Sequence, residues 1–164
     1  MNQPLNVLVL CTGNSARSIL GEALFNHLGA GRVCAFSAGS QPSGKVNPVA
    51  LETLQKHGIP LPDPRSKSWD EFAAPGAPQL DLIFTVCASA AGETCPVWPG
   101  HPATAHWGIA DPAHVEPIEA RRAAFEVAYR QLRARIEALL ALPLETMAAD
   151  EIKSAARRIH EEAP

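Results

Sequence analysis

The first thirty residues combine an apolar run, a loop of small residues and a helix-forming segment. Residues 5–10 are almost wholly apolar, and the loop that begins at Cys11 ends this run abruptly. Residues 18–28 then repeat apolar side chains with helical spacing, and Gly29 follows, a residue typical of helix ends. A continuously apolar strand that leads into a helix is typical of a parallel sheet buried on both faces. The opening of the chain therefore predicts an α/β fold.

Strand-like and helical segments go on alternating along the chain. Asn47 and Pro48 suit the start of a helix that Gly58 would close, and a short helix is expected after Ser68. Such alternation implies a parallel sheet covered on both faces. We therefore predict a four-stranded parallel sheet flanked by helices on both faces, with an extra C-terminal helix. The further strands are expected at residues 33–37, at 80–86 and near His106, and the further helices at 117–142 and 147–160.

The composition excludes several classes of partner. The formal net charge is −3 at pH 7, so the chain has no general attraction for nucleic acid or anionic lipid. We recognise no leader segment and no apolar stretch long enough to span a membrane, and we expect a cytoplasmic monomer. In that compartment the four cysteines indicate catalytic or metal-binding thiols rather than a structural disulfide framework.

The loop at residues 11–18 has the residue types of an oxyanion-binding site. Its small residues lead into a helix start, so backbone N–H groups and the positive end of the helix dipole can face one point. The guanidinium of Arg17 matches two oxygens of a tetrahedral oxyanion. The same positive field favours the nucleophilic thiolate of Cys11, and Ser18 can donate a hydrogen bond to that sulfur. The expected substrate-binding residues are Thr12, Gly13, Asn14, Ser15, Ala16, Arg17 and Ser18.

This loop, Cys-Thr-Gly-Asn-Ser-Ala-Arg-Ser, resembles the phosphate-binding loop of low-molecular-weight tyrosine phosphatases and of the related arsenate reductases. The resemblance covers roughly residues 5–139 and implies the fold of that family. We therefore place a catalytic domain at residues 1–142 and a helical extension at 143–164. Further motifs that resemble the family, in the same order, are Ser37-Ala38-Gly39, Asn47-Pro48, Val86-Cys87, Cys95-Pro96, His106-Trp107-Gly108 and Asp111-Pro112.

Two more side chains of this region are expected to serve the loop. Asp111 corresponds to the general acid of the family, which protonates the oxygen that leaves when sulfur displaces it from the central atom. An Asp-Pro pair taken alone is more often a turn, so this role depends on the resemblance. Asn14 is expected to hold the strained loop by hydrogen bonds across it.

Arsenate and phosphate are both tetrahedral, so the loop alone does not choose between a reductase and a phosphatase. Reduction of arsenate to arsenite needs two electrons, which two thiols supply by forming a disulfide. Cys87 follows the third predicted strand and is the obvious second thiol, and Cys95 lies further along the chain. The resemblance implies a relay in which Cys87 attacks the adduct on Cys11 and Cys95 then attacks Cys87. It implies thioredoxin as the electron donor, with glutathione and glutaredoxin as the alternative.

A potassium site is a further property of some reductases of the family. These proteins bind the ion near the equivalents of Asn14, Glu22 and Ser37, with an aspartate as a further ligand. In this sequence Lys67 stands in place of that aspartate, and its ammonium would take the place of the cation. We therefore expect no potassium requirement, no other cofactor and no metal site.

Two sets of residues are expected to have no part in the chemistry. Cys34 lies inside the second predicted strand and is interpreted as a small buried hydrophobic residue. The long helix carries several arginines, which we interpret as a solvated face rather than a nucleic-acid surface. These arginines are Arg121, Arg122, Arg130, Arg133 and Arg135.

Four alternatives stay open. A tyrosine phosphatase would use only Cys11, Arg17 and Asp111, but should wall its pocket with aromatic side chains, which form 5% of this chain. A sensor that holds arsenite or a soft metal through its cysteines would leave Arg17 and Asp111 without a role. A phosphocarrier with a cysteine loop would leave Cys87 and Cys95 idle. In the simplest alternative, Cys11 is a buried strand-end thiol and Arg17 a surface residue.

Overall fold

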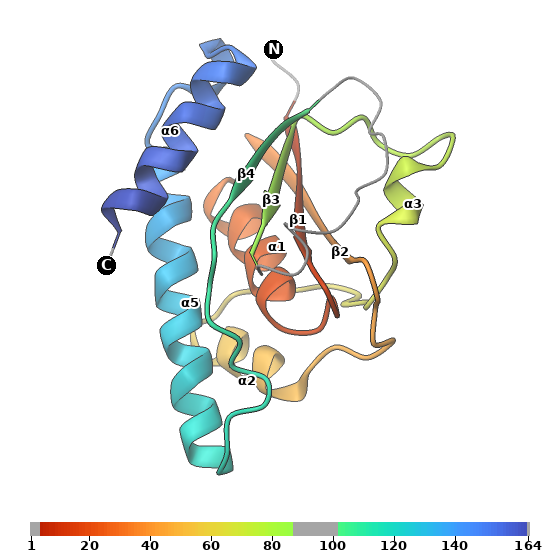
Figure 1. Ribbon diagram of the computed structural model, residues 1–164, viewed down its shortest axis with the longest axis vertical. Coiled ribbons are helices and arrows are strands. Elements are labelled where there is room, and N and C mark those ends of the chain that lie inside the picture. Colours follow the sequence, from red (N-terminus) through yellow and green to blue (C-terminus); the bar gives the residue numbers. More distant parts are fainter. Residues whose placement is uncertain (1–3, 87–101, 164) are drawn as a thin grey trace.

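The computed structural model describes residues 4–86 and 102–163 and contains a four-stranded sheet (Figure 1). All neighbouring strands are parallel, in the order β2-β1-β3-β4, which confirms the predicted sheet. Because β1 and β3 are parallel neighbours, their carboxyl ends lie at the same edge of the sheet. The strands are β1 (Leu5–Cys11), β2 (Val33–Gly39), β3 (Leu82–Thr85) and β4 (Ala103–His106).

The helices lie close to their predicted positions. Asn47 caps α2 as expected, since its side-chain oxygen accepts a hydrogen bond of 2.9 Å from the Val49 N–H. Among the described residues, no helix has both the length and the apolar character that crossing a membrane requires. The helices are α1 (Arg17–Leu28), α2 (Pro48–Lys56), α3 (Asp70–Ala73), α5 (Ile118–Leu140), α6 (Ala149–Glu162) and the 3-10 turn η1 (Leu144–Thr146).

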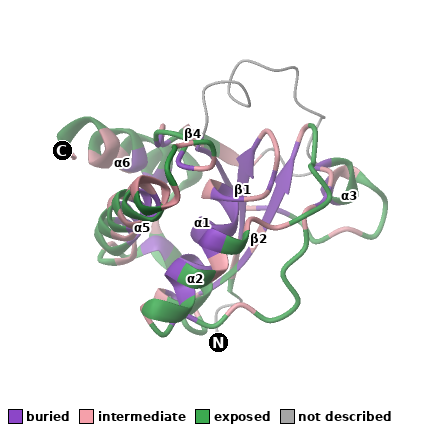
Figure 2. Cartoon of the chain, turned by 90° about the horizontal axis from the view of Figure 1, so that it is seen from below, coloured by how far each residue is buried: buried purple, intermediate pink, exposed green. Residues whose placement is uncertain are grey.

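The central strand β1 is buried on both faces, which explains its continuous apolar sequence. Val7 and Val9 belong to the main core together with residues of α1, α2 and α5. Leu8 and Leu10 belong to a smaller cluster, to which α3 contributes Phe72. Figure 2 shows the buried strands between these layers. The prediction of helices on both faces is confirmed, although the helix that covers the second face is short.

Stacked aromatic rings connect the sheet to the C-terminal helix. The Phe84 ring lies 5.5 Å from the Phe25 ring and 4.2 Å from the Trp107 ring, measured between centroids. The fully buried Trp107 donates a hydrogen bond of 2.9 Å from its indole nitrogen to the Ala156 carbonyl oxygen in α6. Ile152 and Ala156 are part of the main core. The predicted helical extension therefore shares the core of the sheet, while its separation as a unit after residue 142 stays a prediction.

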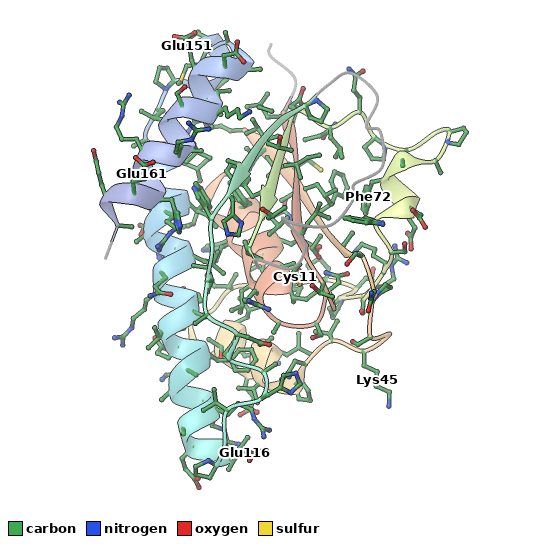
Figure 3. All side chains as sticks on the ribbon, in the orientation of Figure 1. Cys11, Lys45, Phe72, Glu116, Glu151 and Glu161 are labelled. Atoms are coloured by element: carbon green, nitrogen blue, oxygen red, sulfur yellow. The ribbon has the colours of Figure 1, made fainter. Side chains whose placement is uncertain are left out.

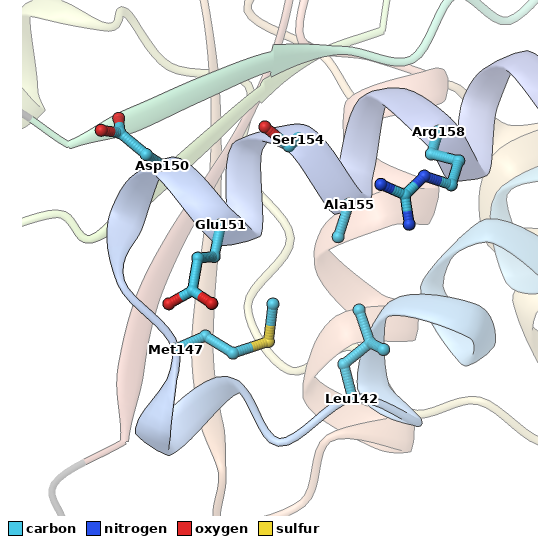
Figure 4. A pocket seen from close by; sticks show the side chains of 7 residues that line it. All are labelled: Leu142, Met147, Asp150, Glu151, Ser154, Ala155 and Arg158. Atoms are coloured by element: carbon cyan, nitrogen blue, oxygen red, sulfur yellow. The ribbon is translucent and has the colours of Figure 1, made fainter.

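The first half of α6 borders a groove of about 460 Å³ (Figure 4). Glu151 on this stretch caps the helix, because its carboxylate accepts a hydrogen bond of 2.8 Å from the Ala148 N–H. The groove is lined by both charged and apolar side chains. Its lining residues are Leu142, Met147, Asp150, Glu151, Ser154, Ala155 and Arg158.

The interpretation of the long-helix arginines as a solvated face is wrong for Arg135. Its side chain is 5% exposed, whereas Arg122 and Arg130 are exposed as expected. Arg135 donates a hydrogen bond of 3.2 Å from Nε to His160 Nδ1 in α6, so the C-terminal helix covers it. Burial lowers the pKa of Arg135 below its ordinary value.

Candidate active site

The nucleophile predicted from the sequence, Cys11, lies at the carboxyl end of β1 (Figure 3). Its side chain is 4% exposed, and its sulfur lies 2.9 Å from the hydroxyl oxygen of Ser18 in the first turn of α1. The Asn14 N–H donates a second hydrogen bond to the sulfur, over 3.2 Å. The Ser18 hydroxyl can therefore donate to this sulfur, as the sequence predicts, beside the Asn14 N–H.

The backbone of the loop turns its carbonyl groups outward. The carbonyl oxygens of Thr12, Gly13 and Ser15 accept hydrogen bonds of 2.8–3.0 Å from backbone N–H groups of the segment between β2 and α2. The C=O and N–H groups of a trans peptide point in opposite directions. The N–H groups that follow these carbonyls are therefore directed into the loop, as an oxyanion requires.

A close approach of β2 to the loop depends on Gly39. A Cβ atom at this position would lie 2.4 Å from the Thr12 carbonyl oxygen, closer than real Cβ contacts, and 3.0 Å from the Asn14 nitrogen, which is also tight. The missing side chain thus allows the end of β2 to support the back of the loop. This explains the place of Gly39 in the Ser37-Ala38-Gly39 motif.

Asn14 connects the loop to three neighbouring segments. Its φ of 46° lies in the left-handed region, and its side chain is fully buried. The side-chain amide donates hydrogen bonds to the hydroxyl groups of Ser18, over 2.8 Å, and Ser37, over 3.0 Å. Its carbonyl oxygen accepts one of 2.8 Å from the Lys67 N–H. The predicted structural role of Asn14 is confirmed.

Arg17 and Asp111 face each other beside Cys11. Arg17 donates a hydrogen bond of 2.8 Å from Nη1 to the Ile109 carbonyl oxygen, and its Nη2 lies 3.7 Å from an Asp111 carboxylate oxygen. The side chains are 15% exposed in Arg17 and 42% exposed in Asp111, so both can be reached from solvent. The fold thus brings together three of the side chains that the sequence predicts.

A pocket of about 250 Å³ opens above the nucleophile. Its wall includes the loop and also Ala113 and His114, which the sequence analysis missed. The only signal in the sequence was their place directly after the Asp111-Pro112 motif. The Ala113 N–H donates a hydrogen bond of 2.9 Å to the Asp111 carboxylate, and this turn carries the chain past the pocket. The lining residues are Cys11, Thr12, Gly13, Ser15, Ala16, Arg17, Asp111, Ala113 and His114.

A second polar cluster lies behind the loop. The Ser37 hydroxyl donates a hydrogen bond of 2.6 Å to the Glu22 carboxylate, and Lys67 Nζ lies 3.8 Å from the same Glu22 oxygen. The Lys67 side chain is 9% exposed. Burial lowers the pKa of Lys67, and the Glu22 carboxylate opposes this change by favouring the ammonium. The lysine thus lies beside the residues of the cation site that the sequence analysis named.

Comparison with known proteins decides the family. Residues 6–154 match the family described as low molecular weight phosphotyrosine protein phosphatase. The chain belongs to this family. An arsenate reductase from Brevibacillus brevis is 37% identical to it over 130 residues, which make up 79% of this chain and 93% of that protein.

Solved structures of other proteins share the fold. An arsenate reductase in the phosphate binding state matches with a TM-score of 0.67 and 26% identity, over 84% of this chain and 97% of the other. A tyrosine phosphatase from Erwinia amylovora matches with a TM-score of 0.63 and 26% identity, over 82% and 90% of the two chains. The fold therefore serves proteins named for either activity.

The other three cysteines of this family member are Cys34, Cys87 and Cys95. Cys87 and Cys95, the second and third thiols of the predicted relay, lie outside the described residues. The expectation that Cys34 is buried is wrong, because its side chain is exposed. It lies on β2, the edge strand of the sheet. Among the described residues, His, Cys, Asp and Glu side chains form no group of three or more that could hold a metal ion.

Proposed function

We propose that this protein is an arsenate reductase with Cys11 as its nucleophile. The observation that carries the proposal is the pocket of about 250 Å³, in which a thiol, the guanidinium of Arg17 and the carboxyl of Asp111 surround a space lined by small side chains. These groups suit a small tetrahedral oxyanion. The 37% identity with a protein named arsenate reductase favours arsenate as that oxyanion.

In the first step, the Cys11 thiolate attacks the arsenic atom. A sulfur–arsenic bond forms, and one arsenic–hydroxyl bond breaks as that hydroxyl takes a proton from Asp111 and leaves as water. The inward N–H groups of the loop and the Arg17 guanidinium stabilise the charge on the remaining oxygens. No electrons have been transferred to arsenic at this stage.

Reduction takes place when the Cys87 thiolate attacks the sulfur of Cys11. A disulfide forms between these two cysteines while the sulfur–arsenic bond breaks. Its electron pair stays on arsenic, which changes from As(V) to As(III) and leaves as arsenite. Cys95 then attacks Cys87 and releases the Cys11 thiolate. We propose thioredoxin as the dithiol that reduces the Cys87–Cys95 disulfide, and the reducing cytoplasm as the compartment.

A tyrosine phosphatase is the second candidate, because a protein with this name shares the fold at 26% identity. Its substrate carries an aromatic ring, which aromatic pocket walls would hold. Among the described residues, those that line the pocket include no Phe, Tyr or Trp. Tyr129, the single tyrosine, is buried in α5 and stacks on His57 with their ring centroids 4.0 Å apart. The pocket therefore favours a free oxyanion over an aryl ester.

The test is arsenate-dependent oxidation of NADPH in the presence of thioredoxin and thioredoxin reductase. We expect turnover by the wild type and loss of steady-state turnover in Cys95→Ser, with one equivalent of arsenite still formed per enzyme. Cys34→Ser is the matched control, because this exposed cysteine lies on an edge strand outside the pocket, and it should keep the wild-type rate.

Three results would contradict parts of the proposal. A wild-type rate in Cys95→Ser, or faster turnover with glutathione and glutaredoxin, would show that the electron route is wrong. Hydrolysis of an aryl phosphate without any reduction of arsenate would establish the phosphatase instead.

We also propose that the enzyme works without potassium. Lys67 Nζ, 3.8 Å from Glu22, supplies a positive charge beside the Ser37–Glu22 hydrogen bond, where a bound cation would otherwise be needed. The arsenate reduction rate should be equal in potassium chloride and in choline chloride at the same ionic strength. Strong stimulation by potassium in the wild type would overturn this proposal.

A further inference from the structure

Among the described residues that line the oxyanion pocket, Arg17 is the single arginine and there is no lysine. Arsenate and phosphate carry about two negative charges near neutral pH, and the attacking group is itself a thiolate. The side chain of Arg17 lines the pocket, but it is shared, since it donates to the Ile109 carbonyl oxygen and lies 3.7 Å from Asp111. A further donor that faces the anion would offset this shortage.

His114 is the other one, among the described residues that line the pocket, whose side chain can carry positive charge. It belongs to the segment after β4, whereas Arg17 and the loop follow β1, so the pocket has walls from two parts of the chain. The hydrogen bond from the Ala113 N–H to Asp111 fixes the turn that brings His114 to the wall. The histidine is exposed and can therefore meet an anion that enters from solvent.

We propose that His114 is a second oxyanion-binding residue, which donates an N–H to a free tetrahedral anion held by the loop. A histidine side chain can donate in both of its protonation states and is a cation in one of them. This inference rests on the proposed function only in that arsenate is the anion. His114 acts in binding and takes no part in the thiol relay, so it affects KM for arsenate and leaves kcat nearly unchanged.

The binding test uses inorganic phosphate and needs no reductant cycle. Phosphate bound in the loop should protect Cys11 from alkylation by iodoacetamide, and the extent of alkylation can be measured on the tryptic peptide of residues 1–17, in which Cys11 is the single cysteine. In His114→Ala, half-protection should require roughly three- to tenfold more phosphate, which corresponds to about 0.7–1.4 kcal/mol, the size of one hydrogen bond. His114→Lys keeps a charged donor and should stay near the wild type.

His27→Ala is the matched control, because this histidine is exposed on α1 and does not line the pocket. It should show wild-type protection. Wild-type protection in His114→Ala, or an equal loss in His114→Lys and His114→Ala, would overturn the assignment, as would absence of any protection in the wild type. Phosphate protection that depends on His114 in a protein unable to reduce arsenate would support the binding role and overturn the proposed function alone.

Discussion

At the scale of single residues, the loop at residues 11–18 is held by the buried side chain of Asn14. Asn14 makes three buried hydrogen bonds, to the hydroxyl groups of Ser18 and Ser37 and from the Lys67 N–H. Asn14→Ala should lower the free energy of unfolding by roughly 2–4 kcal/mol, since each buried group left unpaired costs about 1–3 kcal/mol. Urea unfolding followed by circular dichroism measures this change.

Asn14→Asp is the matched variant for the same prediction. It keeps the oxygen that accepts from the Lys67 N–H but loses both donors, so its stability should fall between those of the wild type and Asn14→Ala. If Asn14→Ala unfolds at the same urea concentration as the wild type, the hydrogen bonds of Asn14 do not hold the loop.

Gly39 allows the end of β2 to lie against the same loop, because it has no side chain. A Cβ atom in Gly39→Ala would lie 2.4 Å from the backbone oxygen of Thr12, and backbone cannot move aside as a flexible side chain does. We expect this variant to lose phosphate protection of Cys11. In the control Gly108→Ala the new Cβ meets the movable ring of His106 at 3.0 Å, and protection should persist. Equal protection in Gly39→Ala and the wild type would contradict the role of Gly39.

The sequence predicts the reactive residues of the pocket better than the other residues of the pocket wall and the exposure of the neighbouring strand. Cys11 and Arg17 could be placed because one ends a strand and the other begins a helix, and ligand sites lie at the carboxyl ends of parallel strands. Asp111 could be placed only through the resemblance of its Asp-Pro pair to the family. His114 was missed because no local pattern shows on which side of a turn a side chain lies. The exposure of Cys34 depends on what covers an edge strand, which the residues of that strand do not encode.

At the scale of elements, Arg32 joins the chain between α1 and β2 to the end of α5. Its guanidinium donates hydrogen bonds of 2.6 Å to the Leu140 carbonyl oxygen and of 2.9 Å to the Leu142 carbonyl oxygen just beyond the helix. The carbonyl oxygen of the last residue of a helix, here Leu140, has no partner within the helix. It also donates to both carboxylate oxygens of Glu145, over 2.7 Å and 3.0 Å. Arg32 therefore caps the long helix and fixes the turn that leads to α6.

The Arg32–Glu145 contact predicts a pH dependence of stability. The hydrogen bonds from Arg32 lower the pKa of Glu145 from 4.5 to about 2. A carboxyl with a lowered pKa in the folded state stabilises that state above its unfolded pKa, and this contribution is lost as the pH falls toward 2. The urea midpoint of the wild type should therefore exceed that of Glu145→Gln at pH 6, and the difference should shrink between pH 4.5 and 2.

Glu161→Gln provides the comparison, because Glu161 is exposed near the end of α6. The urea midpoint of Glu161→Gln should equal that of the wild type at each pH between 6 and 2. A difference between wild type and Glu145→Gln that stays constant down to pH 2 would show that the charge of Glu145 does not contribute through Arg32.

The helices and strands were largely predictable from the sequence, but which of them pack against each other was not. The apolar period of α5 and the proline that follows it predict a long helix, but not that α6 returns along it. For that reason Arg135 looked like part of a solvated face, although it is buried beside His160. Burial of a helix face is a property of the neighbouring element, which periodicity in one segment cannot report.

At the scale of the whole molecule, described residues after 142 pack into the core of the catalytic domain. Leu144, Ile152 and Ala156 are buried in the same core as the sheet, and Trp107 both packs there and donates to α6. Burying one Leu or Ile side chain contributes about 1.5–3 kcal/mol, so loss of this segment removes roughly 3–6 kcal/mol from the two large side chains alone. A typical domain has a total stability of about 5–15 kcal/mol.

A chain truncated after residue 142 should therefore unfold at a much lower urea concentration than the full chain, or lose cooperative unfolding. Without α6, Trp107 and Arg135 would meet water on a surface shaped to pack against a helix. Truncation after residue 162 is the control, because it keeps the whole of α6 and should leave the midpoint unchanged. The opposite result is that residues 1–142 unfold cooperatively at the wild-type urea midpoint and that phosphate still protects Cys11. In that case the boundary predicted at residue 142 separates an independent catalytic domain, and the contacts of α6 add nothing to its stability.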